Sequence, residues 1–319
     1  MNENVDSGYP SEITVDEIQL LISLRLLVPK RFSACIDQGI TSEARSYSDV
    51  KITRFEEIQP GLALIGSAVD YAQVGDRSSF VGPKEIRKYL DGLAQDIGNV
   101  AWFTSDNIET YGARVSYCMY LCRIMKSFPI VIGGDHSITK FCFREVTYSC
   151  NTEIGLIHFD AHNDLGDIKS ENNLDNLMHS NVISHISEMP CSFIAQVGVR
   201  DSQLLKGNQS IDTPLYQLQD SLCEEYIDFL DNVENIHANT PIYLSIDIDC
   251  LNPTFAREVA APLGGGISDE LLVNMVDYIF RRFDVVGMDI VEVCGSETKE
   301  NNAAKSAARV IEVVNERFK

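Results

Sequence analysis

The stretch Ile154-Gly155-Leu156-Ile157-His158-Phe159-Asp160-Ala161-His162-Asn163-Asp164 decides the fold. It begins as a short apolar run, which is typical of a buried parallel strand, and then breaks into three metal-ligand side chains within five residues. Asp160 and His162 are two residues apart, so in an extended chain they point to the same side, and Asp164 follows once the chain turns. Such side chains are costly at the end of a buried strand unless a cation neutralises them. The stretch therefore predicts a parallel strand that ends at a cation site.

Two further apolar segments end in the same kind of residue. Phe128–Ile132 runs into Gly-Gly-Asp-His-Ser at residues 133–137, and Ile242–Ile246 runs into Asp-Ile-Asp at residues 247–249. Hard carboxylate oxygens with a minority of imidazole nitrogens favour Mn²⁺, and Fe, Co, Ni or Zn stay open from ligand type alone. Two metals about 3.5 Å apart would lower the pKa of a water between them. The candidate ligands of this dinuclear site are His136, Asp160, His162, Asp164, Asp247 and Asp249.

Strand and helix patterns alternate along the chain. Strands are also expected at Gly61–Ala68, Phe193–Val199 and Val285–Val293, and helices at Val15–Leu27, Lys84–Leu93, Ile108–Lys126, from Ser137 or Thr139, over acidic Leu218–Asn235, from Asp269 and over Ala303–Arg317. This alternation predicts an α/β fold: a single three-layer α/β/α domain with a mostly parallel central sheet. The site is expected at the carboxyl edge of the strands.

Composition narrows the classes of function. The chain has 319 residues, 45% of them hydrophobic, and a formal net charge of −21. That charge argues against nucleic acid and anionic membranes as partners and is compatible with a cationic substrate. No apolar run approaches the roughly 18 residues of a membrane span, and the N-terminus lacks the pattern of a secretory signal. With nine cysteines that read as reduced thiols, the chain is expected to be cytoplasmic.

In its strand-end motifs the sequence resembles the ureohydrolase superfamily, which includes arginase, agmatinase, guanidinobutyrase and formiminoglutamase. The motifs at residues 133–137, 160–164 and 245–249 stand in the family order, and Asp-Ile-Val-Glu-Val at 289–293 adds a fourth match. The resemblance implies an arginase-like fold, with residues 56–319 as a ureohydrolase-like catalytic domain. Residues 1–55 would be an N-terminal extension with a helix. A homo-oligomer, trimer or hexamer, is also implied.

The resemblance implies a role for each matching residue. His136 and Asp164 would bind one Mn²⁺, His162 and Asp249 the other, and Asp160 and Asp247 would bridge the two. Hydroxide between the ions would attack the guanidinium carbon, giving a tetrahedral intermediate that collapses to urea and an amine. Asp164 would pass the proton to the leaving nitrogen, and Glu292 would hold the guanidinium cation. His179 would be a proton shuttle at the mouth of the pocket.

Other residues near the motifs are given simpler roles. His158 lies deeper on the strand than Asp160 and is interpreted as a satisfied core histidine. Asp135 is expected to orient backbone or ligands rather than to bind metal. His185 and His237 have no partner pattern and are treated as ordinary residues.

Departures from the family pattern concern the substrate. Gln203 stands where arginases carry an Asp that reads the α-amino group, and Leu165–Ser180 matches neither arginase nor agmatinase well. Residues 137–139 and the Gly82-Pro83 turn lean toward the agmatinase branch. We therefore expect an amidinohydrolase that acts on a guanidino compound other than free L-arginine. Agmatine, a guanidino acid, or an arginine within a peptide would fit.

Three alternatives stay open. One is an arginase that takes free L-arginine. Another is hydrolysis of a different C–N bond, such as a formimino group or an acetyl amide, although deacetylases of this broad fold keep a single zinc. The last is a non-catalytic homologue, which the intact ligand set argues against because unneutralised buried charges destabilise a fold.

Overall fold

The computed structural model describes residues 58–71, 79–90, 95–100, 102, 106–168, 177–201, 212–234, 236, 240–298 and 300–319. The expected helix at Val15–Leu27, the 1–55 extension, Gln203 and His237 lie outside these residues. Of the loop at 165–180, residues 169–176 also lie outside them.

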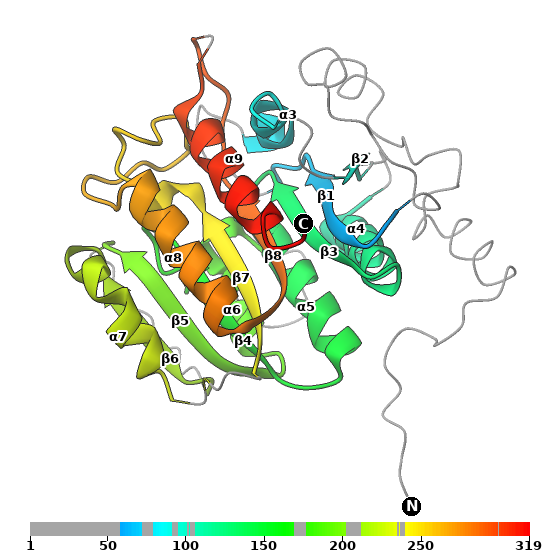
Figure 1. Cartoon of the computed structure of the whole chain (residues 1–319), viewed down its shortest axis with the longest axis horizontal. Helices are drawn as coiled ribbons and strands as arrows, with labels where there is room; N and C mark the ends of the chain where they lie inside the picture. The colour runs from blue at the N-terminus through cyan, green and yellow to red at the C-terminus, as the bar shows by residue number, and fades with distance from the viewer. Residues whose placement is uncertain are drawn as a thin grey trace, which may run out of the picture.

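One parallel sheet forms the middle of the molecule (Figure 1). It has eight strands in the order β2-β1-β3-β8-β7-β4-β5-β6, and each neighbouring pair is parallel. The strands are β1 (Gly61–Ser67), β2 (Gln95–Asn99), β3 (Ser127–Gly133), β4 (Ile154–Phe159), β5 (Cys191–Val199), β6 (Leu215–Gln219), β7 (Pro241–Asp247) and β8 (Asp284–Val291). The three strands expected to carry ligands are confirmed as β3, β4 and β7, and they lie at the centre with β8.

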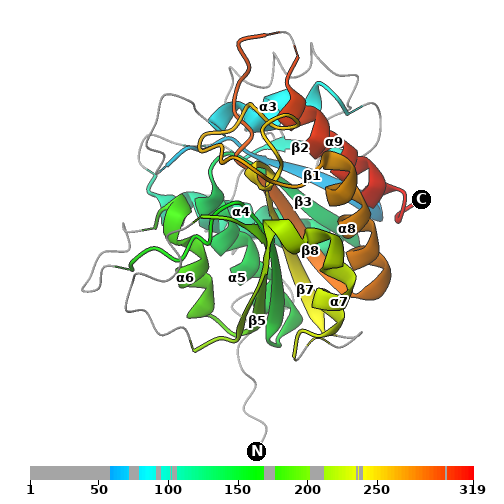
Figure 2. The ribbon, with the colours of Figure 1, turned by 90° about the vertical axis from the view of Figure 1, so that its left-hand side faces the viewer.

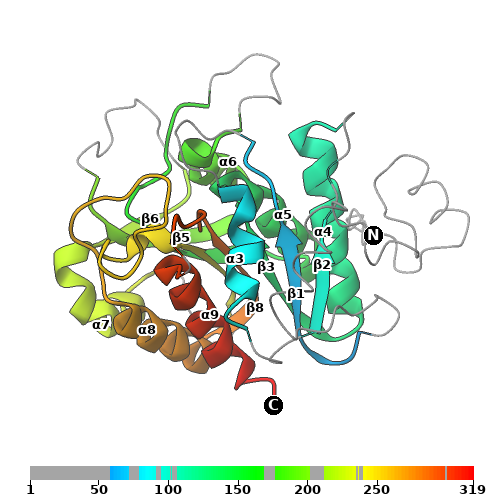
Figure 3. The same cartoon turned by 90° about the horizontal axis from the view of Figure 1, so that it is seen from above.

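Helices cover both faces of the sheet. They are α3 (Gly82–Arg87), α4 (Ile108–Ile124), α5 (Thr139–Cys150), α6 (Val182–Ser187), α7 (Tyr226–Asp231), α8 (Asp269–Arg282) and α9 (Asn302–Asn315). Seen from above, α4, α5 and α6 lie on one side of the strands, and α3, α7, α8 and α9 lie on the other (Figure 3). The three-layer α/β/α architecture is therefore confirmed. No helix in the described ranges is both long and apolar enough to cross a membrane.

Burial on both faces explains the apolar strands. Every residue of β4 is buried, and its side chains alternate between two cores. Ile157 and Phe159 pack in the core that includes α8 and α9 residues, whereas Ile154 and Leu156 pack in the core that includes α4 and α5 residues. The twist of the sheet between these layers is visible from the side (Figure 2). Asp160 continues the alternation on the α4–α5 side.

Two expectations about elements are corrected. The acidic stretch Leu218–Asn235 is not one helix: β6 takes its first two residues, a 3-10 helix follows at Asp220–Glu225, and α7 is only six residues long. Strand β2 was not expected, because Gln95–Asn99 is mostly polar. Both missed strands lie at the edges of the sheet, where a strand has a neighbour on one side only. Such strands do not need the continuous apolar run that marks a central one.

Candidate metal centre

The same local turn follows three central strands. An aspartate at the end of the strand accepts a hydrogen bond from the backbone N–H two residues later. Asp160 Oδ1 accepts from His162 N at 2.6 Å, Asp247 Oδ1 from Asp249 N at 2.8 Å, and Asp135 Oδ1 from Ser137 N at 3.1 Å. In two of these turns the residue that donates, His162 or Asp249, is itself a candidate ligand. The spacing of two residues in the sequence therefore determines the backbone turn at the strand end as well as which ligands stand there.

Close packing holds the turn after β3. Asp135 N donates to Val69 O at 2.9 Å, and Asp135 Oδ2 accepts from Tyr71 N at 2.5 Å. A Cβ on Gly134 would collide with the Val69 carbonyl group, so this position requires glycine. Asp135 therefore orients backbone, as expected from the sequence.

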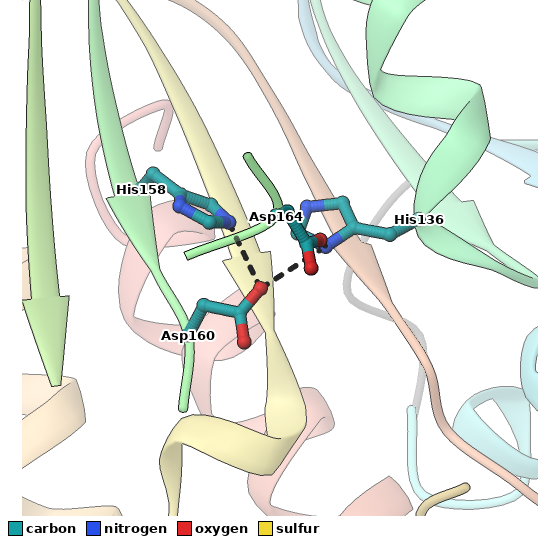
Figure 4. Close-up of side chains that lie close together, drawn as sticks. All are labelled: His136, His158, Asp160 and Asp164. Carbon is teal, nitrogen blue, oxygen red and sulfur yellow. Dashed lines mark ion pairs between the residues drawn. The ribbon is translucent and has the colours of Figure 1, made fainter. Parts of the chain in front are cut away.

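Three carboxylates surround one nitrogen of His136. His136 Nδ1 lies 3.1 Å from Asp164 Oδ2, 3.3 Å from Asp160 Oδ2 and 3.4 Å from Asp247 Oδ2. Figure 4 shows Asp160 and Asp164 meeting at this ring, with His158 on the far side of Asp160. All of these side chains are buried or nearly so. They form the first of two candidate ligand sets.

The second set uses the other oxygen of Asp160. His162 Nδ1 lies 3.3 Å from Asp160 Oδ1 and 3.0 Å from Asp249 Oδ2. His162 is less buried than His136 and lies toward the solvent side of the site. Asp160 therefore stands between two His–carboxylate sets and offers one oxygen to each, as a bridging ligand must.

The hydrogen bonds of His136 identify which nitrogen is free to bind a cation. Ser245 Oγ donates to Asp289 Oδ1 at 2.7 Å, so its proton is committed, and it lies 2.9 Å from His136 Nε2. Ser245 must then accept from an N–H at Nε2, so Nδ1 is the nitrogen that can offer a lone pair to a cation. Nδ1 has no hydrogen-bond partner among the described residues and faces carboxylate oxygens. A cation at this point would satisfy both partners, so the residues present fit a metal.

Electrostatics support the same conclusion. Burial alone would lower the pKa of His136, but Asp160, Asp164 and Asp247 outweigh it and raise that pKa well above its usual value. Burial, together with Asp249 and Asp160, raises the pKa of Asp247 well above its usual range. Without a metal the cluster holds excess negative charge that must recruit protons. Two divalent cations would balance the four carboxylates of the candidate set.

Two functional candidates have unusual backbone conformations. Asp164 has φ of 49° and Glu292 has φ of 65°, a left-handed region that residues with a Cβ seldom adopt. Such conformations cluster at functional sites, where the surrounding structure imposes them. Glu292 Oε1 accepts from His136 N at 2.8 Å, so this carboxylate lies directly beside the first ligand set. Burial first, and then Asp247 and Asp135, raise the pKa of Glu292 well above its usual value.

His179 lies next to the centre rather than in it. It begins the short 3-10 helix His179–Asn181, which packs against the 3-10 helix His136–Ile138. Its ring is half-buried and does not belong to either ligand set. This position suits a group that exchanges protons at the margin of a site.

Sequence reasoning gave too simple a role to His158 and missed its neighbours. His158 is fully buried, as expected of a core residue, but its Nε2 lies only 3.0 Å from Asp160 Oδ2. Ser245 and Asp289, which orient His136, were not singled out either. The available signal was spacing: His158 and Ser245 each stand two residues before an aspartate of the site and so share its side of the sheet.

Known proteins resemble this chain in both sequence and fold. The model of the arginase family matches residues 60–314. An agmatinase from Neisseria meningitidis is 31% identical over 264 residues, covering 77% of this chain and 83% of that protein. A hypothetical agmatinase from Burkholderia thailandensis has a TM-score of 0.70 at 23% identity, covering 84% of this chain and 89% of that one. An arginase from Medicago truncatula has a TM-score of 0.69 at 20% identity, covering 95% and 98%.

The sheet and the shared carboxylate define an α/β protein with a site suited to two cations. The match over residues 60–314 then identifies the family: the chain belongs to the arginase family, whose members hydrolyse guanidino and amidino C–N bonds. The resemblance inferred from the strand-end motifs is thereby confirmed.

Proposed function

We propose that this protein is a binuclear-manganese amidinohydrolase that hydrolyses a guanidino compound to urea and an amine. One observation carries the proposal. Asp160 lies between His136 Nδ1 and His162 Nδ1, with one carboxylate oxygen 3.3 Å from each nitrogen. Two cation positions that share a carboxylate are the arrangement that two-metal hydrolases use.

The proposed ligands combine the two sets with the family resemblance, which gives Asp247 its place as a second bridge. His136 and Asp164 would hold one Mn²⁺, His162 and Asp249 the other, and Asp160 and Asp247 would touch both. When bound, the two metal ions would lower the pKa of a water molecule and so supply a nucleophile near neutral pH. Oxygen and imidazole donors without thiolate suit Mn²⁺.

The remaining roles belong to three side chains. Glu292 would hold the cationic guanidinium group by charge-assisted hydrogen bonds. Asp164 would carry the proton of the attacking water to the leaving nitrogen, so that addition of water to the guanidino carbon and cleavage of a C–N bond yield urea and an amine. His179 would exchange protons with solvent at the margin of the site.

The substrate we propose is agmatine-like rather than free L-arginine. Gln203 lacks the carboxylate that would pair with an α-amino group, and the Neisseria meningitidis protein that is 31% identical to this chain is an agmatinase. The net charge of −21 also favours approach of cations. An arginine within a peptide fits the same reasoning because its α-groups are not free. We further propose a cytoplasmic homo-oligomer, trimer or hexamer, with residues 56–319 as the catalytic domain.

A substrate panel tests the proposal. Manganese-loaded protein is incubated with agmatine, 4-guanidinobutyrate, L-arginine, an arginine-containing peptide and N-formimino-L-glutamate. Release of urea and of formamide is measured. We expect urea from one of the first two or from the peptide, with a kcat/KM well above that for L-arginine. A kcat/KM that is much higher for L-arginine than for the other compounds would overturn the substrate assignment. Release of formamide without urea would overturn the proposed reaction.

A further inference from the structure

A row of polar side chains crosses the buried sheet one layer beneath the ligands. Strand register pairs Gln217 with Gln196, Gln196 with His158, His158 with Ser245, and Ser245 with Asp289 across five adjacent strands. Except for half-buried Gln217, all of these residues are fully buried. Ser245 and Asp289 already have a role, since they orient His136. The other half of the row contains His158 and two glutamines.

Hydrogen bonds fix the orientation of the Gln196 amide. Gln196 Nε2 donates to the Asn163 carbonyl oxygen at 2.8 Å, and a carbonyl can only accept. Gln196 Oε1 accepts from Gln217 Nε2 at 2.7 Å. Exchanging the oxygen and nitrogen of this amide would break both bonds, so the NH₂ group must be where it stands.

The orientation of Gln196 determines the tautomer of His158. The same Nε2 lies 3.0 Å from His158 Nδ1, and an amide NH₂ group can only donate, so its second proton is the one available to that ring nitrogen. Nδ1 must therefore accept, and a neutral ring then carries its proton on Nε2. A metal bound at Nε2 needs a lone pair there, which this tautomer does not have. His158 thus differs from His136, whose Nδ1 faces the carboxylates and can offer its lone pair to a cation.

Two unsatisfied atoms face each other at this point. His158 Nε2 and Asp160 Oδ2 lie 3.0 Å apart, and neither atom makes a hydrogen bond in the described part of the chain. A buried donor and a buried acceptor left unpaired would each destabilise the folded chain. Pairing them removes both effects.

We propose that His158 is a positioning residue for the metal centre: it donates a hydrogen bond from Nε2 to Asp160 Oδ2 and does not bind metal itself. Asp160 is then held at both oxygens, because Oδ1 accepts from His162 N at 2.6 Å. Each oxygen keeps a lone pair for one cation, and the carboxylate cannot rotate away from either ligand set. Gln196 sets the tautomer and, through the Asn163 carbonyl, also holds the turn that carries Asp164.

The inference rests on the proposed metal centre but not on the proposed reaction, so its test uses no substrate. Neutron diffraction from manganese-soaked crystals of the full chain locates the ring deuterons directly. We expect a deuteron on Nε2 of His158 directed at Asp160, and none on Nδ1. A deuteron on Nδ1, or manganese bound to Nε2, would overturn the assignment.

Variants measure what the contact contributes. His158→Phe removes the donor, whereas His158→Gln places an amide N–H close to the position of Nε2. Loss of an outer partner of a metal ligand typically weakens metal binding 10–100-fold. We expect the Kd for Mn²⁺, measured by calorimetry, to rise by about that factor in His158→Phe and by less than about threefold in His158→Gln. His185→Phe, the matched control on α6, should bind Mn²⁺ like the unaltered protein.

Comparing His158→Phe with His158→Gln separates a positioning role of His158 from a role in packing alone. Thermal unfolding of the metal-free variants reports packing, because no manganese contributes to it. Binding that is equally weak in His158→Phe and His158→Gln, or unchanged in His158→Phe, would contradict the positioning role. If urea release is absent in every protein while the binding pattern holds, the proposed reaction fails and the inference stands.

Discussion

At the scale of the residue, Asp160 is the centre of the site. Its Oδ1 lies 3.3 Å from His162 Nδ1 and accepts a hydrogen bond from the His162 backbone, whereas its Oδ2 lies 3.3 Å from His136 Nδ1 and 3.0 Å from His158 Nε2. The spacing of two between Asp160 and His162 made this site predictable, since strand alternation brings such residues to one side. The supporting roles of Asp289 and Gln196 were not predictable. These roles depend on the register between strands, which a single sequence does not specify.

Replacing His162 with alanine tests the second ligand set. Loss of an outer partner costs 10–100-fold in affinity or activity, so loss of a ligand should cost more than about 100-fold in kcat for urea release. Metal analysis of the variant should show about one Mn²⁺ per chain instead of two. A variant that releases urea at the unaltered rate would support a non-catalytic role for this centre.

Glu292→Gln tests the binding of the guanidinium group. The amide oxygen can still accept from His136 N, so the ligand sets should keep their manganese. A hydrogen bond to a charged group contributes about 1.5–3 kcal/mol, and we therefore expect kcat/KM to fall by roughly 10–100-fold. Glu316→Gln, an exposed carboxylate in the last turn of the chain, is the control. If Glu292→Gln no longer holds its manganese, Glu292 belongs to the metal site instead.

At the scale of the element, central strands were predictable and edge strands were not. β3, β4 and β7 are apolar because helices cover both faces, and their sequences show it. β2 and β6 lie at the edges, and their polar residues are tolerated there. Gln217 of β6 is an example: it donates a hydrogen bond to Gln196 of the neighbouring strand, and the sequence around Gln217 alone does not predict that partner.

Helix α5 carries a buried carboxyl group that should make stability depend on pH. Burial raises the pKa of Glu145 to about 7 from an ordinary 4.5, although Arg123 and Ser149 partly oppose the shift. Its Oε2 has no hydrogen-bond partner among the described residues. Because the folded chain retains a proton that the unfolded chain releases, stability should fall as the pH rises from about 4.5 to about 7.

Glu145→Gln removes this titration. At pH 8 the variant should be more stable than the unaltered protein by on the order of 3 kcal/mol, and at pH 4.5 the two should be similar. Urea unfolding of metal-free protein at both pH values measures the difference. An equal effect at both values would show that the shift does not arise from burial of the carboxyl group.

At the scale of the whole molecule, the metal pair should contribute to stability as well as to function. The chain has a formal charge of −21, and four of its carboxylates converge at one edge of the sheet. A ligand at a thousandfold excess over its Kd stabilises the folded state by about 4 kcal/mol, so two sites would contribute roughly 8 kcal/mol.

Chelation therefore gives a global prediction. Treatment with EDTA should lower the Tm by on the order of 10 °C, and added Mn²⁺ should restore it. Differential scanning calorimetry checks both steps, with Mg²⁺ as the comparison because it binds imidazole poorly. A Tm that does not respond to EDTA or Mn²⁺ would mean that the carboxylates are neutralised in another way.

The central claim is that Asp160 joins two cation positions. Anomalous diffraction at the manganese absorption edge, from crystals grown with Mn²⁺, tests it most directly. The account predicts two peaks, one beside His136 and one beside His162, with a carboxylate oxygen of Asp160 next to each. A single peak, or two peaks of which neither contacts Asp160, would contradict it.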